Sequence, residues 1–231
     1  MATHPVRLEA SIDPNLTRWM WLVKWLLAIP HYFVLIFLQI GAVIVWIIAF
    51  ISVLITGTYP RPLFDYTVGV MRWNWRVNAY VTLLSTDRYP PFKLGSDPDY
   101  PADLDVAYPE RLSRGLALVK WWLLAIPHYL LIAAFLGSWS SGDRHQMTER
   151  ANEVPPAGLA VLGVLVLIAI VGLVFTGRYL PGIFDLRMGL HRWYIRVAVY
   201  AALLTDEYPP FRLDQGGREP IAEPAPAGAT G

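Results

Sequence analysis

The amino-acid sequence contains one series of motifs twice, and this duplication restricts the possible folds more than any other feature. The segment 23–32, VKWLLAIPHY, returns at 119–129 as VKWWLLAIPHY, with one extra Trp. Phe-Asp, Gly, Arg-Trp and Arg-Val motifs follow within 64–80 and return with the same spacing within 184–200. Each series closes on the same phrase, YPPFKL and then YPPFRL. The chain therefore consists of two tandem copies of one unit.

The repeat also sets the domain boundaries. The first copy covers residues 1–97 and the second covers 98–213. The remaining segment, 214–231, is rich in Pro, Ala and Gly. Such a composition buries too little apolar surface to fold, so it predicts a disordered tail.

Long apolar runs predict an integral membrane protein. Only 16% of the residues are charged, against about 25% in an ordinary soluble domain. The run 157–175 contains no charged residue, and its roughly 28 Å of helix matches the hydrocarbon thickness of a bilayer. Ten Trp and twelve Tyr residues are present, most of them at the ends of apolar runs, where such rings favour the headgroup level.

A polar insertion in the second copy places a loop between two helices. Between the Pro-His-Tyr and Thr-Gly motifs the first copy is apolar throughout, over 33–55, whereas the second contains the polar segment 137–156. Hydrocarbon leaves no partner for the backbone groups of an irregular segment, so the insertion cannot lie inside a lipid-facing helix. This predicts transmembrane helices at 112–136 and 157–176.

By the repeat, the first copy is expected to cross the membrane as a hairpin over 16–56. Its helices would cover 16–38 and 42–55, with the turn at 39–41. The sequence leaves one alternative open, in which a single long helix over 30–55 crosses the membrane after an interfacial helix. In the hairpin the second helix is short for a span, which predicts tilt or local thinning of the bilayer.

The distribution of charge supports two crossings per copy. With that topology every Lys and Arg except Arg144 and Arg150 falls on one side of the membrane. An excess of Lys and Arg marks the cytoplasmic side, so both termini are expected in the cytoplasm of a multi-pass protein. The predicted fold is an all-α integral membrane protein of two parallel tandem repeats, with about four transmembrane helices.

A short strand is expected near the start of the first copy. Val6, Leu8 and Ala10 alternate with charged or polar residues, which is the period of a strand with one buried face. Residues 103–107 alternate in the same way and are its expected partner.

Each copy contains an Asp-x6-Arg-x3-Arg pattern on a predicted amphipathic helix, at 64–84 and at 184–203. The residues are Asp65, Arg72, Arg76, Asp185, Arg192 and Arg196. At 100° per residue the three positions of each copy fall within about 40° of one another. Two interpretations follow. The Arg side chains reach lipid phosphates while each Asp pairs internally, or the guanidinium groups form a specific site for an anionic headgroup or a partner.

Four more polar residues fall inside the predicted membrane helices. His31 and His128 each follow a Pro, and their imidazoles are expected to bond a backbone carbonyl or a partner helix at the kink. Haem ligation from both sides by the two His residues is a remaining alternative. Lys24 and Lys120 are expected to extend toward the interface. No nucleophile with a base, no metal-ligand cluster and no other cofactor motif is present, and Cys is absent, so no catalytic residue is expected.

These motifs, WLLAIPHY, TG-x-YP, FD-x3-G-x2-RW and YPPF, resemble the bacterial membrane family known as domain of unknown function 4389. The resemblance covers nearly the whole chain, in two copies. The family occurs mainly in actinobacteria, which implies a protein of the bacterial plasma membrane. It has no established activity, so it implies no catalytic residues. The second copy departs from the TG-x-YP motif at Leu180.

The sequence thus predicts a non-catalytic membrane protein that acts as an accessory or scaffold subunit of an envelope complex, or binds anionic lipid through its Asp-Arg-Arg helices. A small transporter or channel with a path between the copies is the alternative, and a haem-binding redox subunit is the third hypothesis. The expected partners are the lipid bilayer, including anionic lipid, and another membrane protein. Nothing in the sequence predicts binding of nucleic acid.

Overall fold

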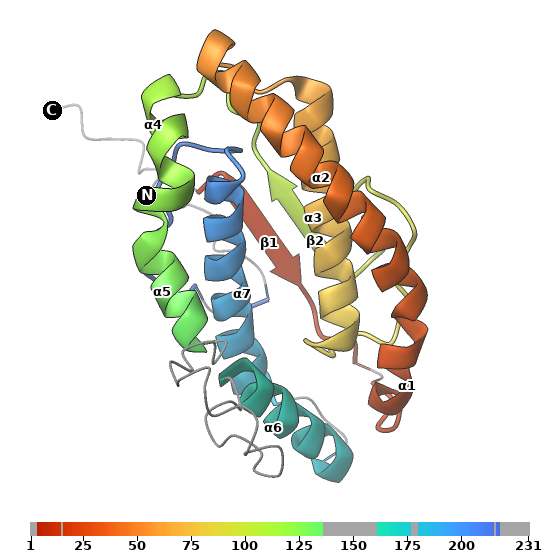
Figure 1. Cartoon of the computed structure of the whole chain (residues 1–231). Coiled ribbons are helices and arrows are strands. Elements are labelled where there is room, and N and C mark those ends of the chain that lie inside the picture. The colour runs from red at the N-terminus through yellow and green to blue at the C-terminus, as the bar shows by residue number, and fades with distance from the viewer. Residues whose placement is uncertain (1–3, 15, 136–160, 177–179, 215, 218–231) are drawn as a thin grey trace, which may run out of the picture.

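The two strands expected from the sequence pair with each other. The computed structural model describes residues 4–14, 16–135, 161–176, 180–214 and 216–217 (Figure 1). Strand β1 (Val6–Ala10) pairs with β2 (Ala102–Val106) in antiparallel register, with Leu8 opposite Leu104. The apolar residues of both strands are buried on one face, as their alternation requires. The predicted strand pair is confirmed.

Two long helices cover the buried face of this sheet. They are α3 (Arg61–Val81) and α7 (Pro181–Ala201). Each has a Pro in its first turn, where the missing N–H is not needed. They run in opposite directions in Figure 1, and α3 packs on β2 whereas α7 packs on β1. The ends of α3 and α7 lie within three residues of the ends predicted for the two amphipathic helices. Both helices, however, lie inside the protein.

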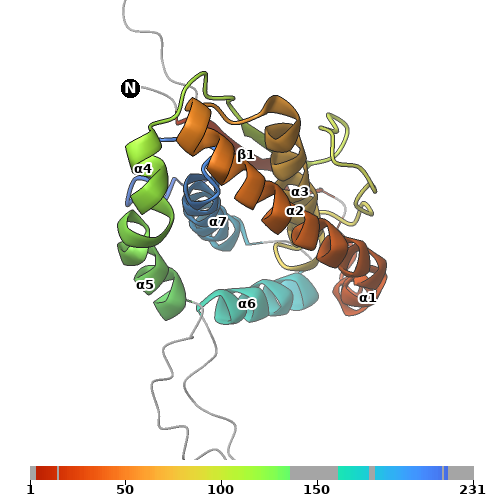
Figure 2. The same cartoon turned by 45° about the horizontal axis from the view of Figure 1, so that its top comes forward.

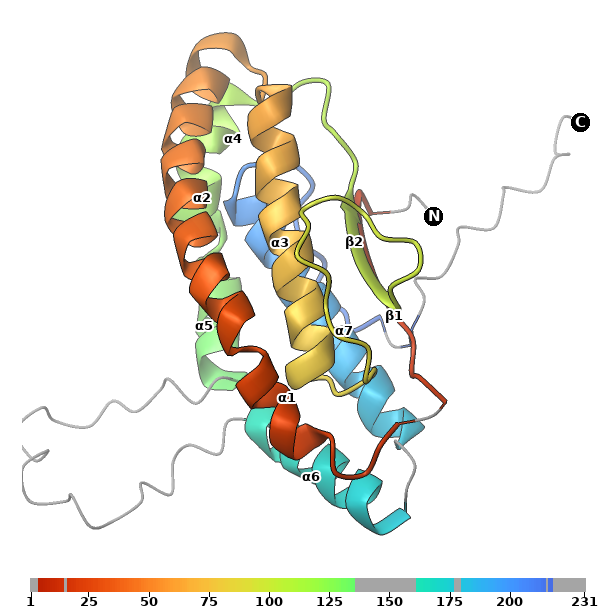
Figure 3. The same cartoon turned by 90° about the vertical axis from the view of Figure 1, so that its right-hand side faces the viewer.

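The apolar helices form an outer layer on the far side of α3 and α7. Figure 3 shows this order of layers, with the sheet on one side and the apolar helices on the other. Figure 2 shows how α6 extends across one end of this layer. The outer helices are α1 (Trp21–Leu27), α2 (Ile29–Thr56), α4 (Arg114–Val119), a π-helical turn η1 (Lys120–Leu124), α5 (Ile126–Phe135) and α6 (Val161–Thr176).

A local two-fold axis relates the two copies. It passes between Leu8 and Leu104, perpendicular to the sheet, because an antiparallel strand pair has that symmetry. The axis exchanges β1 with β2 and α3 with α7 (Figure 1). Both copies therefore place their apolar helices on the same face of the molecule.

The core lies between the sheet and the helices and draws on both copies. Leu8 and Leu104 are buried there with Trp75, Met188 and Val199. Trp75 is 1% exposed, and its Nε1–H donates a hydrogen bond to the Glu9 carbonyl oxygen at 3.1 Å. Because this core is apolar and shared, neither copy is a separate domain in the folded chain.

The hairpin predicted for the first copy is wrong. Helix α2 continues without a turn through residues 39–41. At Gly41 the absence of a side chain allows close approach by Tyr66 of α3, whose hydroxyl donates a hydrogen bond to the Leu38 carbonyl oxygen at 3.0 Å. Gly41 thus serves helix packing and not a turn. The alternative of one long helix after a short one describes α1 and α2.

The expected four transmembrane helices are not supported. Among the described residues one helix, Ile29–Thr56, is long and apolar enough to cross a membrane, and the shorter apolar helix Gly163–Phe175 is not. The predicted helix 112–136 is divided into α4, η1 and α5. The polar insertion 137–156 and all but three residues of the predicted tail lie outside the described residues.

Candidate functional site

Repeated polar residues gather where the apolar part of each copy begins. In the first copy Lys24 lies on α1 and is 1% exposed. Its Nζ donates a hydrogen bond to the Thr86 carbonyl oxygen at 2.8 Å and forms an ion pair with Asp87 at 2.7 Å. Both acceptors follow the C-terminal end of α3. Lys24 therefore connects α1 to the loop after α3.

The second copy builds the same connection despite an inserted residue. Lys120 is fully buried, and its Nζ contacts the Thr205 carbonyl oxygen at 2.8 Å and Asp206 at 2.7 Å. The extra Trp lengthens the spacing from Lys120 to His128 by one residue, and the π-helical turn η1 contains this insertion. The expectation that Lys24 and Lys120 extend to the interface is wrong, because both amines are paired inside the protein.

A leucine with left-handed backbone precedes each Thr-Asp acceptor pair. Leu84 has φ 57° and its counterpart Leu203 has φ 67°. This conformation costs a branched residue about 1–2 kcal/mol, and both copies contain it. It turns the chain sharply after α3 and α7 while the Leu side chains remain buried. The strain thus brings the acidic partner back toward its lysine.

The acidic partners of the buried cations are held in the charged form. Burial raises the pKa of Asp87, but hydrogen bonds from Lys24 and from the backbone N–H of Thr17 outweigh it, so the pKa lies below its ordinary value. Asp214 follows the same pattern, since burial is outweighed by the hydrogen bond from Arg196 and the pKa is lowered. These groups are therefore ion-pair partners and not proton donors or acceptors near neutral pH.

His31 sits in a box of aromatic rings from its own copy. Its ring stacks on Phe92 with centroids 4.0 Å apart and planes at 14°. The Trp73 Nε1–H donates a hydrogen bond to its Nδ1 at 3.0 Å. Tyr89 lies beside the ring and donates its hydroxyl hydrogen to the Leu27 carbonyl oxygen at 3.1 Å. The predicted contact of the imidazole is thus with a partner helix, α3.

His128 has the same surroundings in the second copy. It stacks on Phe211 at 4.2 Å, and Trp193 donates to its Nδ1 at 3.2 Å. An Nδ1 that accepts leaves the proton on Nε2, so each imidazole is neutral. Each Nε2 is enclosed by protein atoms, which does not favour the haem hypothesis. In the part of the chain that the structure describes, no group of three His, Cys, Asp or Glu residues could hold a metal ion.

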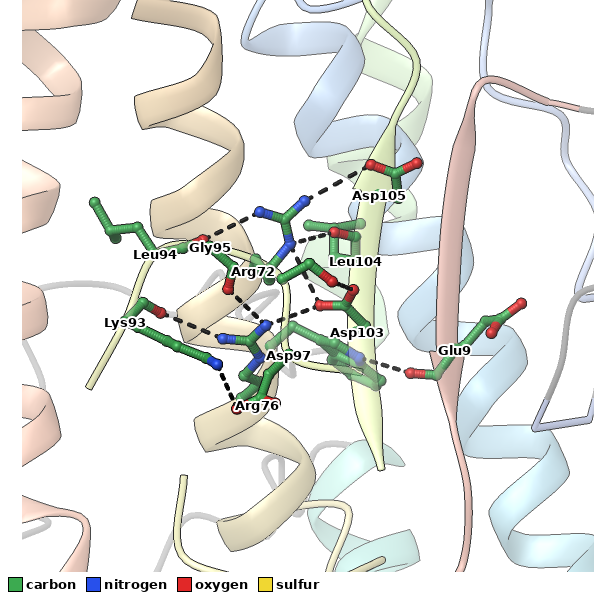
Figure 4. A network of polar contacts seen from close by, with 12 residues as sticks. Glu9, Arg72, Arg76, Lys93, Leu94, Gly95, Asp97, Asp103, Leu104 and Asp105 are labelled. Carbon is green, nitrogen blue, oxygen red and sulfur yellow. Dashed lines mark hydrogen bonds and ion pairs between the residues drawn. The ribbon is translucent and has the colours of Figure 1, made fainter. Parts of the chain in front are cut away.

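Arg72 connects α3 to the free edge of strand β2 (Figure 4). Its Nε donates to the Leu104 carbonyl oxygen at 2.7 Å and its Nη1 donates to the Leu94 carbonyl oxygen at 3.1 Å. Nε also lies 3.3 Å from the Asp103 carboxylate. The guanidinium group therefore satisfies a strand edge that would otherwise expose unpaired backbone groups.

Arg76, one turn further along α3, is completely buried. Its Nη1 donates to the Lys93 carbonyl oxygen at 3.3 Å, and its Nη2 donates to the Gly95 carbonyl oxygen at 2.8 Å and to Asp103 at 3.0 Å (Figure 4). It therefore holds the loop between the copies against both α3 and β2.

The second copy repeats the guanidinium contacts. Arg192 donates through Nε to the Leu8 carbonyl oxygen at 3.0 Å and through Nη1 to the Asp214 carbonyl oxygen at 2.8 Å. Arg196 pairs with the Asp214 carboxylate at 2.6 Å. The Arg-strand contact at Leu8 is the counterpart of the one at Leu104, so the guanidinium groups cover both edges of the sheet.

The structure separates the Asp from the Arg residues of the predicted charged face. Asp65 lies on the surface and pairs with exposed Arg61 at 3.3 Å, and Asp185 is half-buried. The four Arg residues of the two patterns point inward. The hypothesis that they bind a lipid headgroup is not supported, because protein carbonyls and carboxylates already occupy much of the surface of these buried guanidinium groups.

Sequence reasoning missed the acceptors of these networks. Asp87 and Asp206 carry a signal, since Thr-Asp follows α3 and α7 at equivalent places in the repeat. Phe92 and Phe211 lie in the repeated YPPF phrase, which does not by itself indicate that they stack on a His ring. The backbone carbonyls that bind Arg72 and Arg192 leave no mark in the sequence, since any residue supplies one.

Comparison with known proteins agrees with this duplicated arrangement. The family model described as Domain of unknown function (DUF4389) matches residues 18–93 and 157–212, which together exceed half of the chain. The first match covers α1 to the loop after α3, and the second covers α6, α7 and the closing phrase. No curated protein and no solved structure matches the chain. The chain therefore belongs to the family of the Domain of unknown function (DUF4389), of which it contains two copies.

Proposed function

We propose that this protein is a non-catalytic accessory or scaffold protein of the bacterial plasma membrane, bound through its outer helices. The observation that carries the proposal is the apolar surface of the outer layer. Helix α2 exposes Phe33, Phe37, Ile44 and Ile51, each more than half exposed. A contiguous apolar surface of this length exceeds what a soluble monomer leaves in water.

The buried networks support a structural role for the repeated polar residues. Lys24, His31 and Arg76 and their counterparts bond to the chain itself. A catalytic centre instead needs polar groups that converge on a space open to substrate. We therefore infer that these residues stabilise the fold. The function then belongs to the two outer surfaces of the molecule, which are the apolar helices and the outer face of the sheet.

The sheet is the surface available to a protein partner. Its outer face carries Arg7, Glu9 and Asp105, with side chains 59%, 42% and 71% exposed. Charges of both signs give such a surface specificity for a complementary partner. A transporter has less support, because the core between the copies is filled by apolar side chains such as Leu104 and Met188.

Two successive washes of isolated membranes test the membrane role. We expect the full-length tagged chain to remain in the membrane pellet after washes with high salt and with alkaline carbonate, because apolar burial does not depend on charge. Release by either wash, or recovery in the soluble fraction, contradicts the membrane role.

Partner binding is tested on the retained protein. We expect membrane proteins that co-purify with the wild type after mild solubilisation to be lost from the double variant Arg7→Ala and Glu9→Ala. The matched control is Asp99→Ala, an exposed residue of the loop between the copies. If both variants retain the same proteins, the sheet is not the partner surface. If the wild type retains none, the scaffold role is contradicted.

A further inference from the structure

The outer face of the protein is apolar across both copies. Helices α2, α5 and α6 contain no charged residue. Large side chains exposed on them include Phe33, Ile44, Ile55, Leu130, Leu167 and Phe175. Because the two-fold axis places the outer helices of both copies on one side, α2 and α5 lie in one layer, and α6 extends across its end (Figure 3).

The opposite face of the molecule is charged. The sheet turns Arg7, Glu9 and Asp105 outward, away from the apolar helices. Helix α2 runs along α3 for most of its length, and α3 packs on β2 (Figure 3). The depth of the sheet in a membrane is therefore fixed by the orientation of α2.

The packing of α2 on α3, and of α3 on the sheet, restricts how α2 can be oriented in the bilayer. If α2 stood upright across the bilayer, α3 and the sheet would lie beside it at the same depth. Exposed Arg7 and Asp105 would then face hydrocarbon, at a cost of about 3 kcal/mol or more for each charge. A 28-residue helix is also about 42 Å long, which exceeds the roughly 30 Å hydrocarbon core.

We infer that the protein lies on one leaflet of a lipid bilayer, with α2, α5 and α6 parallel to the membrane surface and the two-fold axis along the membrane normal. This arrangement deepens the proposed membrane role and rests on it. It immerses the apolar face and leaves the charged sheet in water. A helix about 10 Å wide fits within one leaflet, whose hydrocarbon is about 15 Å deep.

The ends of the apolar helices have the composition of a membrane interface. Near the start of α1 and α2, Trp19 and Trp25 are exposed, together with Arg18 and Arg88. Near the start of α4, Arg111 is exposed as well. Indole rings favour the headgroup level, and basic side chains favour anionic headgroups. The occupant that fits this rim and the uncharged face together is a bilayer and not a soluble protein.

Thiol labelling of three sites along the first copy tests the arrangement. The chain contains no Cys, so each variant carries one thiol, at Arg18→Cys before α1, Gln39→Cys within α2, or Thr58→Cys after α2. An impermeant maleimide is applied to intact cells and to inside-out vesicles. A helix lying on the cytoplasmic leaflet predicts no labelling on cells for all three, and labelling of the 18 and 58 sites in vesicles.

The alternatives give other patterns. A single crossing exposes one of the 18 and 58 sites on intact cells, and a hairpin exposes the 39 site there. Labelling of the 39 site on cells, or failure to label the 18 and 58 sites from one and the same side, overturns the inference. Before labelling, each variant must be found in the membrane pellet. Recovery in the soluble fraction would instead overturn the proposed membrane role, so the two failures are distinguishable.

Discussion

Replacement of Arg76 by Met is expected to lower the free energy of unfolding by about 3 kcal/mol, because it breaks a buried ion pair and its hydrogen bonds together. The substitution leaves the carbonyl oxygens of Lys93 and Gly95 without their donor and removes one partner of Asp103. Denaturant unfolding in mild detergent, followed by tryptophan fluorescence, measures the change.

A surface ion pair of the same helix provides the control. Arg61 and Asp65 pair at 3.3 Å with side chains 64% and 59% exposed. Exposed pairs contribute about 0–1 kcal/mol, so Asp65→Asn should leave the unfolding curve almost unchanged. Equal effects of the two substitutions would show that Arg76 is not part of a buried network. The counterpart Arg196→Met should resemble Arg76→Met, since Arg196 is also buried against an aspartate.

Replacement of Trp75 by Ala should destabilise the protein by about 3–5 kcal/mol, since it removes a large buried ring and leaves a cavity. Trp75 of the first copy contacts the second copy directly, because its ring lies 5.3 Å from the His191 ring on α7. In the wild type the two copies are expected to unfold together in one transition. We therefore expect Trp75→Ala to abolish this shared transition, as measured by calorimetry in detergent.

Replacement of an exposed tryptophan shows whether the effect of Trp75→Ala comes from the loss of core packing or from the loss of any tryptophan. Trp25 is 58% exposed on α1, so Trp25→Ala should keep the unfolding transition and weaken only the attachment to lipid vesicles. Loss of the transition in Trp25→Ala, or its retention in Trp75→Ala, would contradict the assignment of the core and of the lipid-facing surface.

Much of the architecture could be predicted from the repeat and from periodicity. The alternation of Val6, Leu8 and Ala10 indicated a strand, and the equivalent residues of the second copy supplied its partner. The helices of the Asp-Arg-Arg patterns were found to within a few residues. These predictions succeeded because they depend on local pattern, and two copies supply the same pattern twice.

The arrangement of these elements could not be predicted in the same way. Gly41 resembled a turn, because sequence does not distinguish a turn glycine from one that admits a neighbouring ring such as Tyr66. The Arg residues resembled an interfacial stripe, because their acceptors are mostly backbone carbonyls distant in sequence, among them that of Leu8 for Arg192. Hydropathy alone also predicts a span for any long apolar helix, whether it crosses the bilayer or lies along it.

The depth of α2 in the bilayer tests the central claim most directly. Spin labels on Cys introduced at Phe33, Ile44 and Ile55 lie on one side of the helix, because eleven residues make close to three turns. In reconstituted bilayers, accessibility to oxygen and to a water-soluble nickel complex reports the depth of each label. A helix parallel to the surface predicts the same shallow depth at all three sites. A label at position 44 near the bilayer centre, with those at 33 and 55 near opposite surfaces, would contradict it.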